Sequence, residues 1–300
     1  MKIKTKINLR LTQYSGQTSQ SPWKFTYNEF QELIFIDNQA ILFKTSQEKD
    51  GLTFKYEYPI DSVIEVKEKK IKKKLFEIYD LNFDLDNFYN NLEEDEKLSS
   101  SVNFCSGLRL FLGKNKFESV ISSISSSNNS IARWTTSINK IKKLWGKEYE
   151  FSSGKFYSFP EVNVLKTKYE DCEGNLKSCG VGYRSKYIKE TCEFFSSNNL
   201  ENISKMKYDE AFEYLQEVPG VGPKVADCIL LYGFNFKEAF PTDVWIKRII
   251  SYLYFDNKDI SVKKVREFGI ETFKDNAGYI QLYLFHYARK SGLMEKLKKI

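Results

Sequence analysis

The stretch YLQEVPGVGPKVADCILL, residues 214–231, holds the residue types best suited to chemistry in this chain. Two apolar segments with helical spacing flank the tight turn Pro219–Gly222, whose glycines allow backbone of positive φ. Pro223 stands where a helix would begin, a position that proline favours. Free N–H groups at such a helix start form a ready phosphate site. The pattern predicts a helix–hairpin–helix at about 212–232 that binds the DNA backbone; the plainer alternative is a tight interhelical turn.

Lys224 follows this turn directly and is a candidate nucleophile. In the first turn of the second helix, the helix dipole and partial burial would both lower the pKa of its ammonium group. A lysine with a lowered pKa can act as an amine nucleophile near neutral pH. Cys228 lies one helical turn further on, close enough to interact with it. Taken alone, Lys224 would more often be a surface lysine that contacts phosphate.

A carboxylate suited to the same chemistry lies downstream, in FPTDVWIKRII (240–250). Asp243 precedes a helix with apolar periodicity and is therefore a good N-cap. A capping aspartate is also held rigidly, so a structural and a catalytic role are compatible. If Lys224 and Asp243 converge on one groove, the lysine can attack a sugar C1′ and form an imine. The carboxylate would stabilise the developing oxocarbenium charge and shuttle protons.

The N-terminal third shows the patterns of strands. Five segments alternate apolar and polar residues as half-buried strands do: 3–11, 33–37, 40–44, 52–58 and 62–68. Asp37–Asn38 and Lys49–Gly51 fit hairpin connections between them. We therefore predict an antiparallel sheet. The lysine-rich run 67–74 is interpreted as a solvated strand end or turn, with a phosphate-contacting patch as the alternative.

After residue 75 the apolar spacing becomes helical. The segments with this spacing are 81–92, 131–145, 161–168, 185–196, 207–217, 224–232, 244–254, 261–274 and 276–290. The predicted fold class is therefore α+β, with an N-terminal antiparallel α+β domain at 1–103. It is followed by an all-helical domain at 104–300, which contains the helix–hairpin–helix.

Composition excludes several other classes of protein. The chain has 300 residues, of which 41% are hydrophobic, and a net charge of +6. It can therefore bury a core, and its charge permits a polyanionic partner. His286 is the single histidine, which excludes HExxH zinc proteases and zinc deaminases. No apolar run is long enough to span a membrane, and cysteines without a CxxC pair indicate free thiols in a reducing compartment.

The motifs also resemble a known family. PGVGPKVADC (219–228) followed by PTDV (241–244) is similar to the helix–hairpin–helix DNA glycosylases with the Gly/Pro…Asp motif, HhH-GPD, and more narrowly to the 8-oxoguanine DNA glycosylase/lyases. Other stretches match in the same order: SSNNSIAR (126–133), FPEVNVL (159–165), GVGYRSKYI (180–188) and GYIQLYLF (278–285). The resemblance implies a two-lobed helical domain. It also implies a repair enzyme that removes 8-oxoguanine opposite cytosine and then cleaves the strand by β-elimination.

The resemblance assigns roles to single residues. Lys224 matches the Schiff-base lysine and Asp243 the essential aspartate. The damaged-base pocket would consist of Gly16, Cys228, Gln281 and Phe285. Contacts to DNA and to the orphaned cytosine would come from Asn128, Arg133, Tyr183, Arg184, Gly220, Val221, Gly222 and Trp245. In this assignment Tyr183 is the intercalating wedge and Asn128 fills the space of the flipped base, as base extrusion requires, while the arginines read the cytosine.

Several of these residues have plainer alternatives. Tyr183 and Phe285 could be ordinary core aromatics. Asn128 could be a helix cap, and Gln281 could be a solvent-facing helix residue. We expect His286 to be structural.

The sequence departs from the family at two places. SGQTSQSPWKF (15–25) keeps Gly16 and Gln17 of the family's early GQxFRW segment, but not the FRW part unless this is displaced to Trp23. In the family a glycine carbonyl of this segment senses the hydrogen on N7 of 8-oxoguanine, so the departure falls on the segment that the resemblance assigns to damage discrimination. Trp245 stands where some relatives place a phosphate-binding histidine.

Related branches differ in cysteines and in the lysine. No cysteine follows Cys228, so the four-cysteine iron–sulfur cluster of the endonuclease III branch cannot form. The alkyladenine branch generally lacks the lysine, so Lys224 argues for a glycosylase that also cleaves the strand.

The expected partner is double-stranded DNA that contains a damaged base. We expect a monomer without membrane attachment, located with the genomic DNA in the cytoplasm, nucleoid or nucleus. No metal or organic cofactor is required for the chemistry, and the resemblance implies a monovalent cation at the hairpin 219–222. Two alternatives stay open: the same machinery acting on another oxidised base, such as an oxidised pyrimidine, or a non-catalytic DNA-binding protein. The latter would have no need of Lys224 paired with Asp243.

Overall fold

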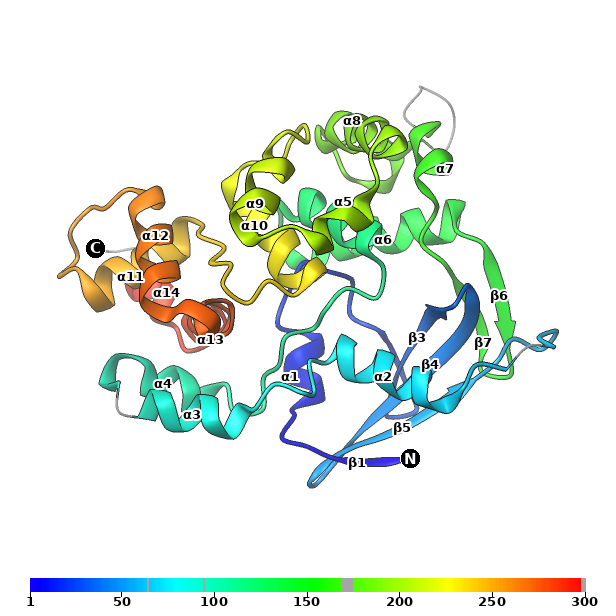
Figure 1. Ribbon diagram of the computed structural model, residues 1–300, viewed down its shortest axis with the longest axis horizontal. Coiled ribbons are helices and arrows are strands. Elements are labelled where there is room, and N and C mark those ends of the chain that lie inside the picture. Colours follow the sequence, from blue (N-terminus) through cyan, green and yellow to red (C-terminus); the bar gives the residue numbers. More distant parts are fainter. Residues whose placement is uncertain (64, 94, 169–174, 298–300) are drawn as a thin grey trace.

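Figure 1 shows the computed structural model, which describes residues 1–63, 65–93, 95–168 and 175–297. An N-terminal sheet of five antiparallel strands precedes a mostly helical part, which confirms the predicted fold class. The strands are β1 (Lys2–Lys4), β2 (Lys24–Thr26), β3 (Glu29–Ile36), β4 (Gln39–Glu48) and β5 (Gly51–Glu57), in the spatial order β1-β5-β4-β3-β2. Asp37 and Asn38 form the predicted β3–β4 turn, both with positive φ.

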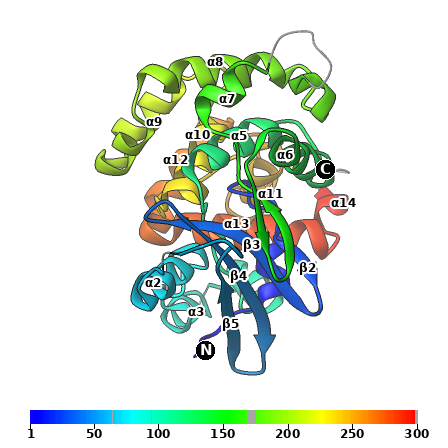
Figure 2. The ribbon, with the colours of Figure 1, turned by 90° about the vertical axis from the view of Figure 1, so that its right-hand side faces the viewer.

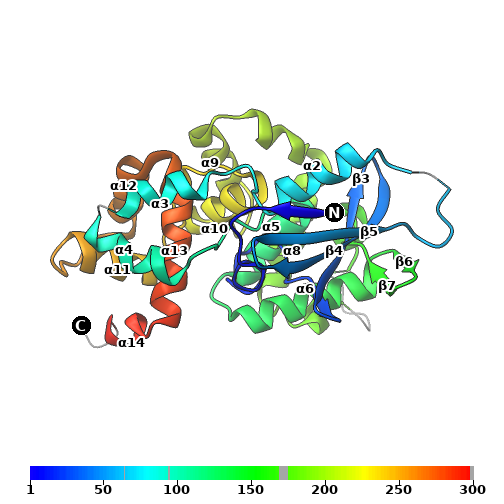
Figure 3. The same cartoon turned by 90° about the horizontal axis from the view of Figure 1, so that it is seen from below.

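Both faces of this sheet are covered. The helix α2 (Glu68–Ile78) packs on one face, where its buried Ile71 and Leu75 join a core with Phe43. The hairpin β6–β7 (Glu148–Phe151 and Gly154–Tyr157) covers part of the other face, beside the sheet in Figures 1 and 3. This hairpin shows that the chain beyond residue 104 is mostly helical rather than all-helical. Its strands are too short for their alternation to stand out between strong helices.

Three strand predictions in the N-terminal third were wrong. The lysine-rich run forms most of α2, because Ile71, Leu75 and Ile78 recur at helical spacing and are buried while the lysines face outward. No strand forms in the described part of 62–68, of which residue 64 lies outside the described residues. Of the predicted strand 3–11, only Ile3 and Lys4 pair with the sheet, as part of β1 (Lys2–Lys4). The helix α1 (Leu9–Gln13) follows it, capped by the Asn8 side chain.

The helical part forms two groups of helices in Figure 1. One group consists of α3 (Leu85–Glu93), α4 (Glu96–Phe104), α11 (Val244–Tyr254), α12 (Val262–Phe273), α13 (Ala277–Lys290) and α14 (Leu293–Leu297). The other consists of α5 (Lys116–Ser126), α6 (Ile131–Trp145), α7 (Val162–Lys166), α8 (Arg184–Ser197), α9 (Tyr208–Gln216) and α10 (Pro223–Cys228). Figure 2 shows α8 and α9 on the side of the molecule away from the sheet. Within the described residues, no helix has the length and apolar character needed to cross a bilayer.

The hydrophobic core of the sheet and that of the helical part each include residues from the other side of the predicted domain boundary at 103–104. The helical core already includes residues of α3, such as Phe88, which packs on α13. The core of the sheet in turn includes Phe111, which stacks on Tyr79. The boundary itself stays a prediction.

A buried group of four charges joins the sheet to the helices. Glu32 of β3 pairs with Lys142 of α6 at 2.8 Å, and Lys114 pairs with Glu118 of α5 at 2.7 Å. Burial raises the pKa of Glu32, but the attraction of Lys114 and Lys142 outweighs it, so the pKa lies below its usual 4.5. Glu32 is therefore ionised at neutral pH and ties the two layers together.

We expect Glu32→Gln to destabilise the protein by about 3–5 kcal/mol, because it leaves Lys142 buried without its counter-charge. Since the folded pKa is depressed, this stabilisation is present above the unfolded value near 4.5 and is lost as the pH falls through the lower folded value. Urea unfolding at pH 7 measures the effect. Glu29→Gln, at a pair with the exposed Lys55, serves as the control and should change stability by about 1 kcal/mol or less. Equal effects of the two substitutions would contradict this account.

Candidate active site

The predicted helix–hairpin–helix is formed by α9, the turn Pro219–Gly222 and α10, which continues as the π-helix Ile229–Gly233. Gly220 has φ +83°, and a Cβ there would lie 2.5 Å from the Tyr187 ring. Gly222 has an ordinary φ of −90° and caps α10, with open space beside it. Of the two glycines, only Gly220 uses the positive φ that the turn was predicted to allow. The openness at Gly222 suits close approach of a ligand to the backbone instead.

This difference gives a matched pair of variants. Gly222→Ala should fold like the wild type, since its Cβ meets nothing within 4 Å. We expect the added methyl group to keep a phosphate away from the backbone N–H groups of the turn. Duplex binding should then weaken about tenfold, which corresponds to the loss of one hydrogen bond to a charged group at about 1.5 kcal/mol. Fluorescence anisotropy with an undamaged duplex measures this. Gly220→Ala should lower both stability and binding. Unchanged affinity in Gly222→Ala would show that the turn does not approach DNA.

Lys224 lies in a small cavity of about 60 Å³ behind the hairpin. The residues that line this cavity come from four places: the N-terminal segment, α10 with its π-helical continuation, the segment that leads into α11, and α13. Some of them also line a wider groove. The lining residues of the cavity are Ser15, Gly16, Gln17, Thr18, Lys224, Cys228, Tyr232, Pro241, Asp243, Gln281, Leu282 and Phe285. The structure thus brings together both predicted catalytic residues and all four predicted pocket residues.

The pKa of Lys224 is raised, contrary to the predicted lowering. Burial lowers it, but the attraction of Cys228 and Asp243 outweighs burial. The pKa of Cys228 is itself raised by burial, against the opposing effect of Lys224. The sequence argument considered the helix dipole and burial but had no means of weighing the facing carboxylate. At rest Lys224 is therefore an ammonium group, which must lose a proton before it can attack.

Asp243 caps α11, as predicted, and the cap uses only one of its two carboxylate oxygens. Its Oδ1 accepts hydrogen bonds from the backbone N–H groups of Trp245 at 2.9 Å and Ile246 at 2.8 Å. Among the described residues, no protein donor bonds to Oδ2. The side chain is half-buried and lines both the cavity and the groove outside it. The cap fixes the carboxylate in place without using up its second oxygen.

Gln281 and Phe285 lie one turn apart on α13 and form one wall. Gln281 is buried; its amide donates to the Pro241 carbonyl at 3.0 Å, and its oxygen accepts from the Tyr232 hydroxyl at 3.2 Å. It is therefore not the solvent-facing residue of the plainer alternative. Phe285 is half-buried at the mouth. His286, one residue on, is buried, and burial lowers its pKa to about 4.

Gly16 belongs to a buried segment that passes between the sheet and the helices. The Gln17 amide donates to the Arg109 carbonyl at 2.9 Å, and its oxygen accepts from the Phe111 N–H at 2.7 Å. Thr18 bonds to Ser123 of α5 at 2.9 Å. Trp23 is buried in the core of the sheet and does not line the cavity. These contacts hold Gly16 at the cavity, although the residue types that follow it differ from those of the family.

A wider groove of about 900 Å³ opens outside the cavity, between the two groups of helices. It contains the predicted DNA-contacting residues Asn128, Arg133 and Trp245, together with Lys224, Asp243 and Phe285. Asn128 is exposed and has positive φ, and the N-cap of α6 is Ser130, so Asn128 is not the cap of that helix. These placements fit a surface that receives a nucleic acid strand.

Tyr183 and Arg184 line a second depression, of about 440 Å³, together with the hairpin. Tyr183 is 59% exposed, which excludes the core alternative. Arg184 is buried, and its guanidinium donates to the carbonyls of Ser127 and Asn128. The structure therefore shows Arg184 holding the Asn128 turn, and it does not place Arg184 in the groove with Arg133.

Several site residues escaped the sequence analysis. Thr18, Tyr232 and Pro241 line the cavity. Tyr232 follows Lys224 and Cys228 at intervals of one turn, a signal that was available. Asp227, by contrast, faces away and forms a buried ion pair with Arg266 of α12 at 2.6 Å, which anchors α10 to α12.

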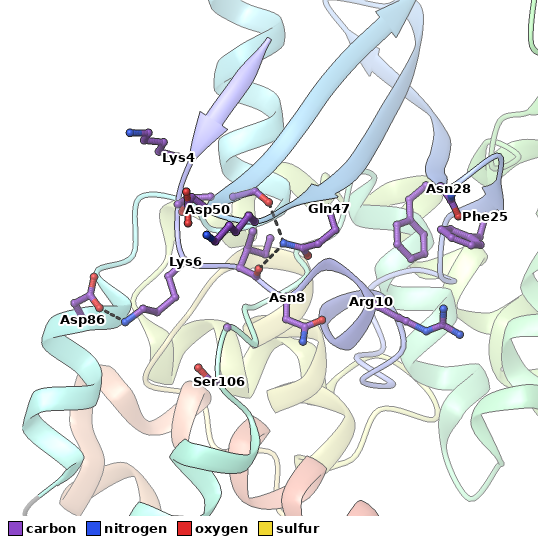
Figure 4. Close-up of a pocket in the computed structure, with 16 residues that line it drawn as sticks. Lys4, Lys6, Asn8, Arg10, Phe25, Asn28, Gln47, Asp50, Asp86 and Ser106 are labelled. Atoms are coloured by element: carbon purple, nitrogen blue, oxygen red, sulfur yellow. Dashed lines mark hydrogen bonds and ion pairs between the residues drawn. The ribbon is translucent and has the colours of Figure 1, made fainter.

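A larger groove of about 1070 Å³ lies elsewhere, on the N-terminal part (Figure 4). None of the predicted site residues lines it. Its Lys6 forms an ion pair with Asp86, and its Gln47 amide donates to the carbonyls of Ile7 and Gly51. Lys6 and Gln47 thus serve contacts within the fold, and we place the chemistry in the Lys224 cavity.

Comparisons with known proteins agree with this site. The family model described as HhH-GPD superfamily base excision DNA repair protein matches residues 121–274, and that of the 8-oxoguanine DNA glycosylase N-terminal domain matches residues 1–120. A probable N-glycosylase/DNA lyase of Methanothermobacter thermautotrophicus is 41% identical, covering 98% of this chain and 97% of that protein. The chain belongs to the HhH-GPD superfamily, and the predicted class of enzyme, a DNA N-glycosylase/lyase, is confirmed.

Solved structures show the same fold. The Clostridium acetobutylicum 8-oxoguanine glycosylase/lyase, in complex with double-stranded DNA containing cytosine opposite 8-oxoguanine, is similar with a TM-score of 0.80 and 30% identity. The match covers 97% of this chain and 98% of that one. A 3-methyladenine DNA glycosylase from Archaeoglobus fulgidus also reaches a TM-score of 0.80, at 25% identity over 97% and 98% of the two chains. The fold alone therefore does not decide which base is removed.

Proposed function

We propose that this enzyme removes 8-oxoguanine paired with cytosine from double-stranded DNA and then cleaves the strand. The observation that carries the proposal is the single cavity in which Gly16, Cys228, Gln281 and Phe285 surround Lys224 beside Asp243. The match of the N-terminal part to the 8-oxoguanine glycosylase domain supports the choice of base. The complex of the Clostridium relative with double-stranded DNA containing cytosine opposite 8-oxoguanine supports it further.

The damaged nucleotide has to leave the helix before chemistry can occur. Extrusion costs a few kcal/mol of stacking, so the protein must replace what it removes. In this proposal the exposed Tyr183, beside the hairpin, wedges next to the gap. Asn128 fills the gap and Arg133 reads the orphaned cytosine, both from the groove. Arg184 supports this step by holding the carbonyls of Ser127 and Asn128. The hairpin 219–222 binds phosphate through backbone N–H groups.

The chemistry follows from Lys224 and Asp243. Once Lys224 has lost its proton, its Nζ bonds to C1′, the bond from C1′ to the base breaks, and the base leaves with the bonding electrons and takes up a proton. The Asp243 carboxylate stabilises the positive charge that develops on the sugar. Ring opening gives the imine, and loss of a proton from C2′ expels the 3′ phosphate oxygen. The strand is thereby cut by β-elimination.

The cavity must enlarge to admit a base. Its volume of about 60 Å³ is far below the several hundred Å³ typical of ligand pockets. Phe285, Lys224 and Asp243 line both the cavity and the groove, so they form the passage between the two. We infer that the half-buried Phe285 ring moves aside and then stacks on the base.

Other expectations complete the proposal. The enzyme acts as a monomer on genomic DNA, in the cytoplasm, nucleoid or nucleus, and its chemistry needs no metal or organic cofactor. The hairpin fits a monovalent cation, because the carbonyls of Pro219 and Gly220 accept no hydrogen bond from the described residues and oxygen is the ligand that hard cations take. Such a cation would supply positive charge next to a phosphate.

A panel of duplexes with a single lesion tests the substrate. We expect base release from 8-oxoguanine opposite cytosine, and much slower release from duplexes that carry guanine or thymine glycol. If only thymine glycol is released, the lysine mechanism stands, but the substrate is an oxidised pyrimidine instead of 8-oxoguanine. Binding without any base release or lyase activity would instead favour the non-catalytic alternative, which the pairing of Lys224 with Asp243 argues against.

The raised pKa of Lys224 gives an expected pH dependence. Because the ammonium form dominates at neutral pH, the reactive amine fraction should rise with pH. Single-turnover cleavage of an abasic-site duplex at saturating enzyme should therefore accelerate by roughly tenfold per pH unit between about pH 7 and 9. Cys228 and Asp243 both raise this pKa. Asp243→Asn removes the contribution of Asp243, so the profile should shift to lower pH. A rate that is already constant below pH 7 in the wild type would indicate a lowered pKa and contradict this account.

A further inference from the structure

Arg289 continues the wall of α13 that faces the cavity. It follows Gln281 and Phe285 at intervals of four residues, so the three side chains form one row along the helix. The Arg289 guanidinium lies 5.6 Å from the centroid of the Phe285 ring. It also lines the groove outside the cavity, where Lys224 and Asp243 lie.

The same guanidinium reaches across to the segment that holds Gly16. Its Nη2 donates to the Ser15 carbonyl at 2.8 Å and lies 3.5 Å from the Tyr14 carbonyl. Nη2 is also 3.5 Å from Nδ1 of His286, which is neutral at pH 7 because burial and the charge of Arg289 lower its pKa. The N-terminal segment is thereby tied to α13 immediately beside the cavity.

Gly16 itself is fitted between Arg289 and α6. Its φ is +90°, a conformation that other residues rarely adopt. A Cβ at this position would overlap Cδ1 of Ile131 and would lie 2.9 Å from Nη1 of Arg289. Arg289 therefore contacts both the Phe285 wall and the backbone around Gly16.

We propose that Arg289 is a positioning residue for base recognition. It fixes the Ser15–Gly16 backbone against the Phe285 wall, so that the two sides of the base pocket keep their spacing when a base enters. This inference rests on the proposed function, because it assigns Arg289 to the pocket that selects the base. It does not involve the attack by Lys224, which needs only the sugar.

Two substrates separate these steps. An 8-oxoguanine duplex requires the base pocket, whereas an abasic-site duplex tests the lysine chemistry without a base. In Arg289→Met, which keeps most of the length but no donor, we expect single-turnover excision of 8-oxoguanine to fall about tenfold, the worth of one charged hydrogen bond. Borohydride trapping on the abasic-site duplex should stay within about twofold. The preference for 8-oxoguanine over guanine should fall as well.

Conservative and neighbouring variants provide the controls. Arg289→Lys keeps the charge and one donor for the Ser15 carbonyl, so it should recover part of the excision rate. Lys290→Met, on the next and exposed residue of α13, should behave like the wild type on both substrates. Thermal unfolding of each variant shows whether α13 remains packed.

The outcomes are distinct. If Arg289→Met and Arg289→Lys lose excision and abasic-site trapping together with thermal stability, Arg289 serves packing in general and the inference is wrong. If Arg289→Met excises 8-oxoguanine like the wild type, Arg289 does not position the pocket, while the proposed function stands. A wild-type enzyme that traps on abasic sites but releases no 8-oxoguanine would overturn the proposed function and this inference with it.

Discussion

Replacement of Lys224 by glutamine is expected to abolish the covalent trapping of the protein on DNA by borohydride. An amide cannot form an imine at C1′, and among the residues that the structure describes no other lysine lines the cavity. We expect the yield of adduct and the rate of strand cleavage to fall at least about 10³-fold, as for the loss of a nucleophile in other enzymes. Glutamine has a similar length, so the buried site stays filled. Duplex binding, which depends on the groove and the hairpin, should be retained.

The matched control is Lys155→Gln, on the hairpin β6–β7 and exposed at a pair with Glu148. It should trap as well as the wild type. An adduct that persists in Lys224→Gln would mean that another amine attacks the sugar, and peptide mapping of the adduct would identify it. Loss of binding in Lys224→Gln would instead indicate that Lys224 contacts phosphate, the plainer alternative for this residue.

Asp243→Asn is expected to slow base removal by about 10² to 10⁴-fold without unfolding the protein. The cap of α11 uses only Oδ1, which accepts from the N–H groups of Trp245 and Ile246. Asparagine keeps an oxygen in that place and is as good an N-cap as aspartate. The substitution therefore removes the negative charge and the second carboxylate oxygen while it preserves the helix start. Single-turnover base release on the 8-oxoguanine duplex measures the effect.

Two further variants separate the cap from the carboxylate. Asp243→Ser keeps a capping oxygen but no charge, so it should be as inactive as Asp243→Asn and nearly as stable as the wild type. Asp243→Ala loses both and should be less stable by about 1 kcal/mol. If activity falls only in the variants that lose stability, or if Asp243→Asn is fully active, then capping α11 is the only role of Asp243.

Local patterns predicted the parts of the molecule that depend on neighbours in sequence. Pro223 begins α10 because its ring suits a first helical residue, and Asp243 caps α11 because its side chain reaches the next free N–H groups. Asp37 and Asn38 form a hairpin turn because both tolerate positive φ. The assembly of Lys224, Asp243 and the pocket residues in one cavity was expected from the family resemblance rather than from these patterns.

The remaining differences arise from contacts between distant segments. The lysine-rich run became a helix because Ile71 and Leu75 are buried against the sheet. The pKa of Lys224 rose because the attractions of Cys228 and of Asp243, which caps another helix, together outweigh the effect of burial. Arg289 could not be found from its spacing alone, since its partners Ser15 and Gly16 lie at the other end of the chain. Each of these effects depends on tertiary geometry that the sequence does not display locally.

The most direct test of the account is borohydride trapping of the wild-type enzyme on a duplex with one 8-oxoguanine opposite cytosine. Matched duplexes that carry guanine, thymine glycol or an abasic site complete the experiment. We predict a covalent adduct on the 8-oxoguanine and abasic-site duplexes and only background on the other two. Trapping confined to the abasic-site or thymine glycol duplex would contradict the proposed substrate. The absence of an adduct on every duplex, with binding intact, would contradict the Schiff-base chemistry of Lys224.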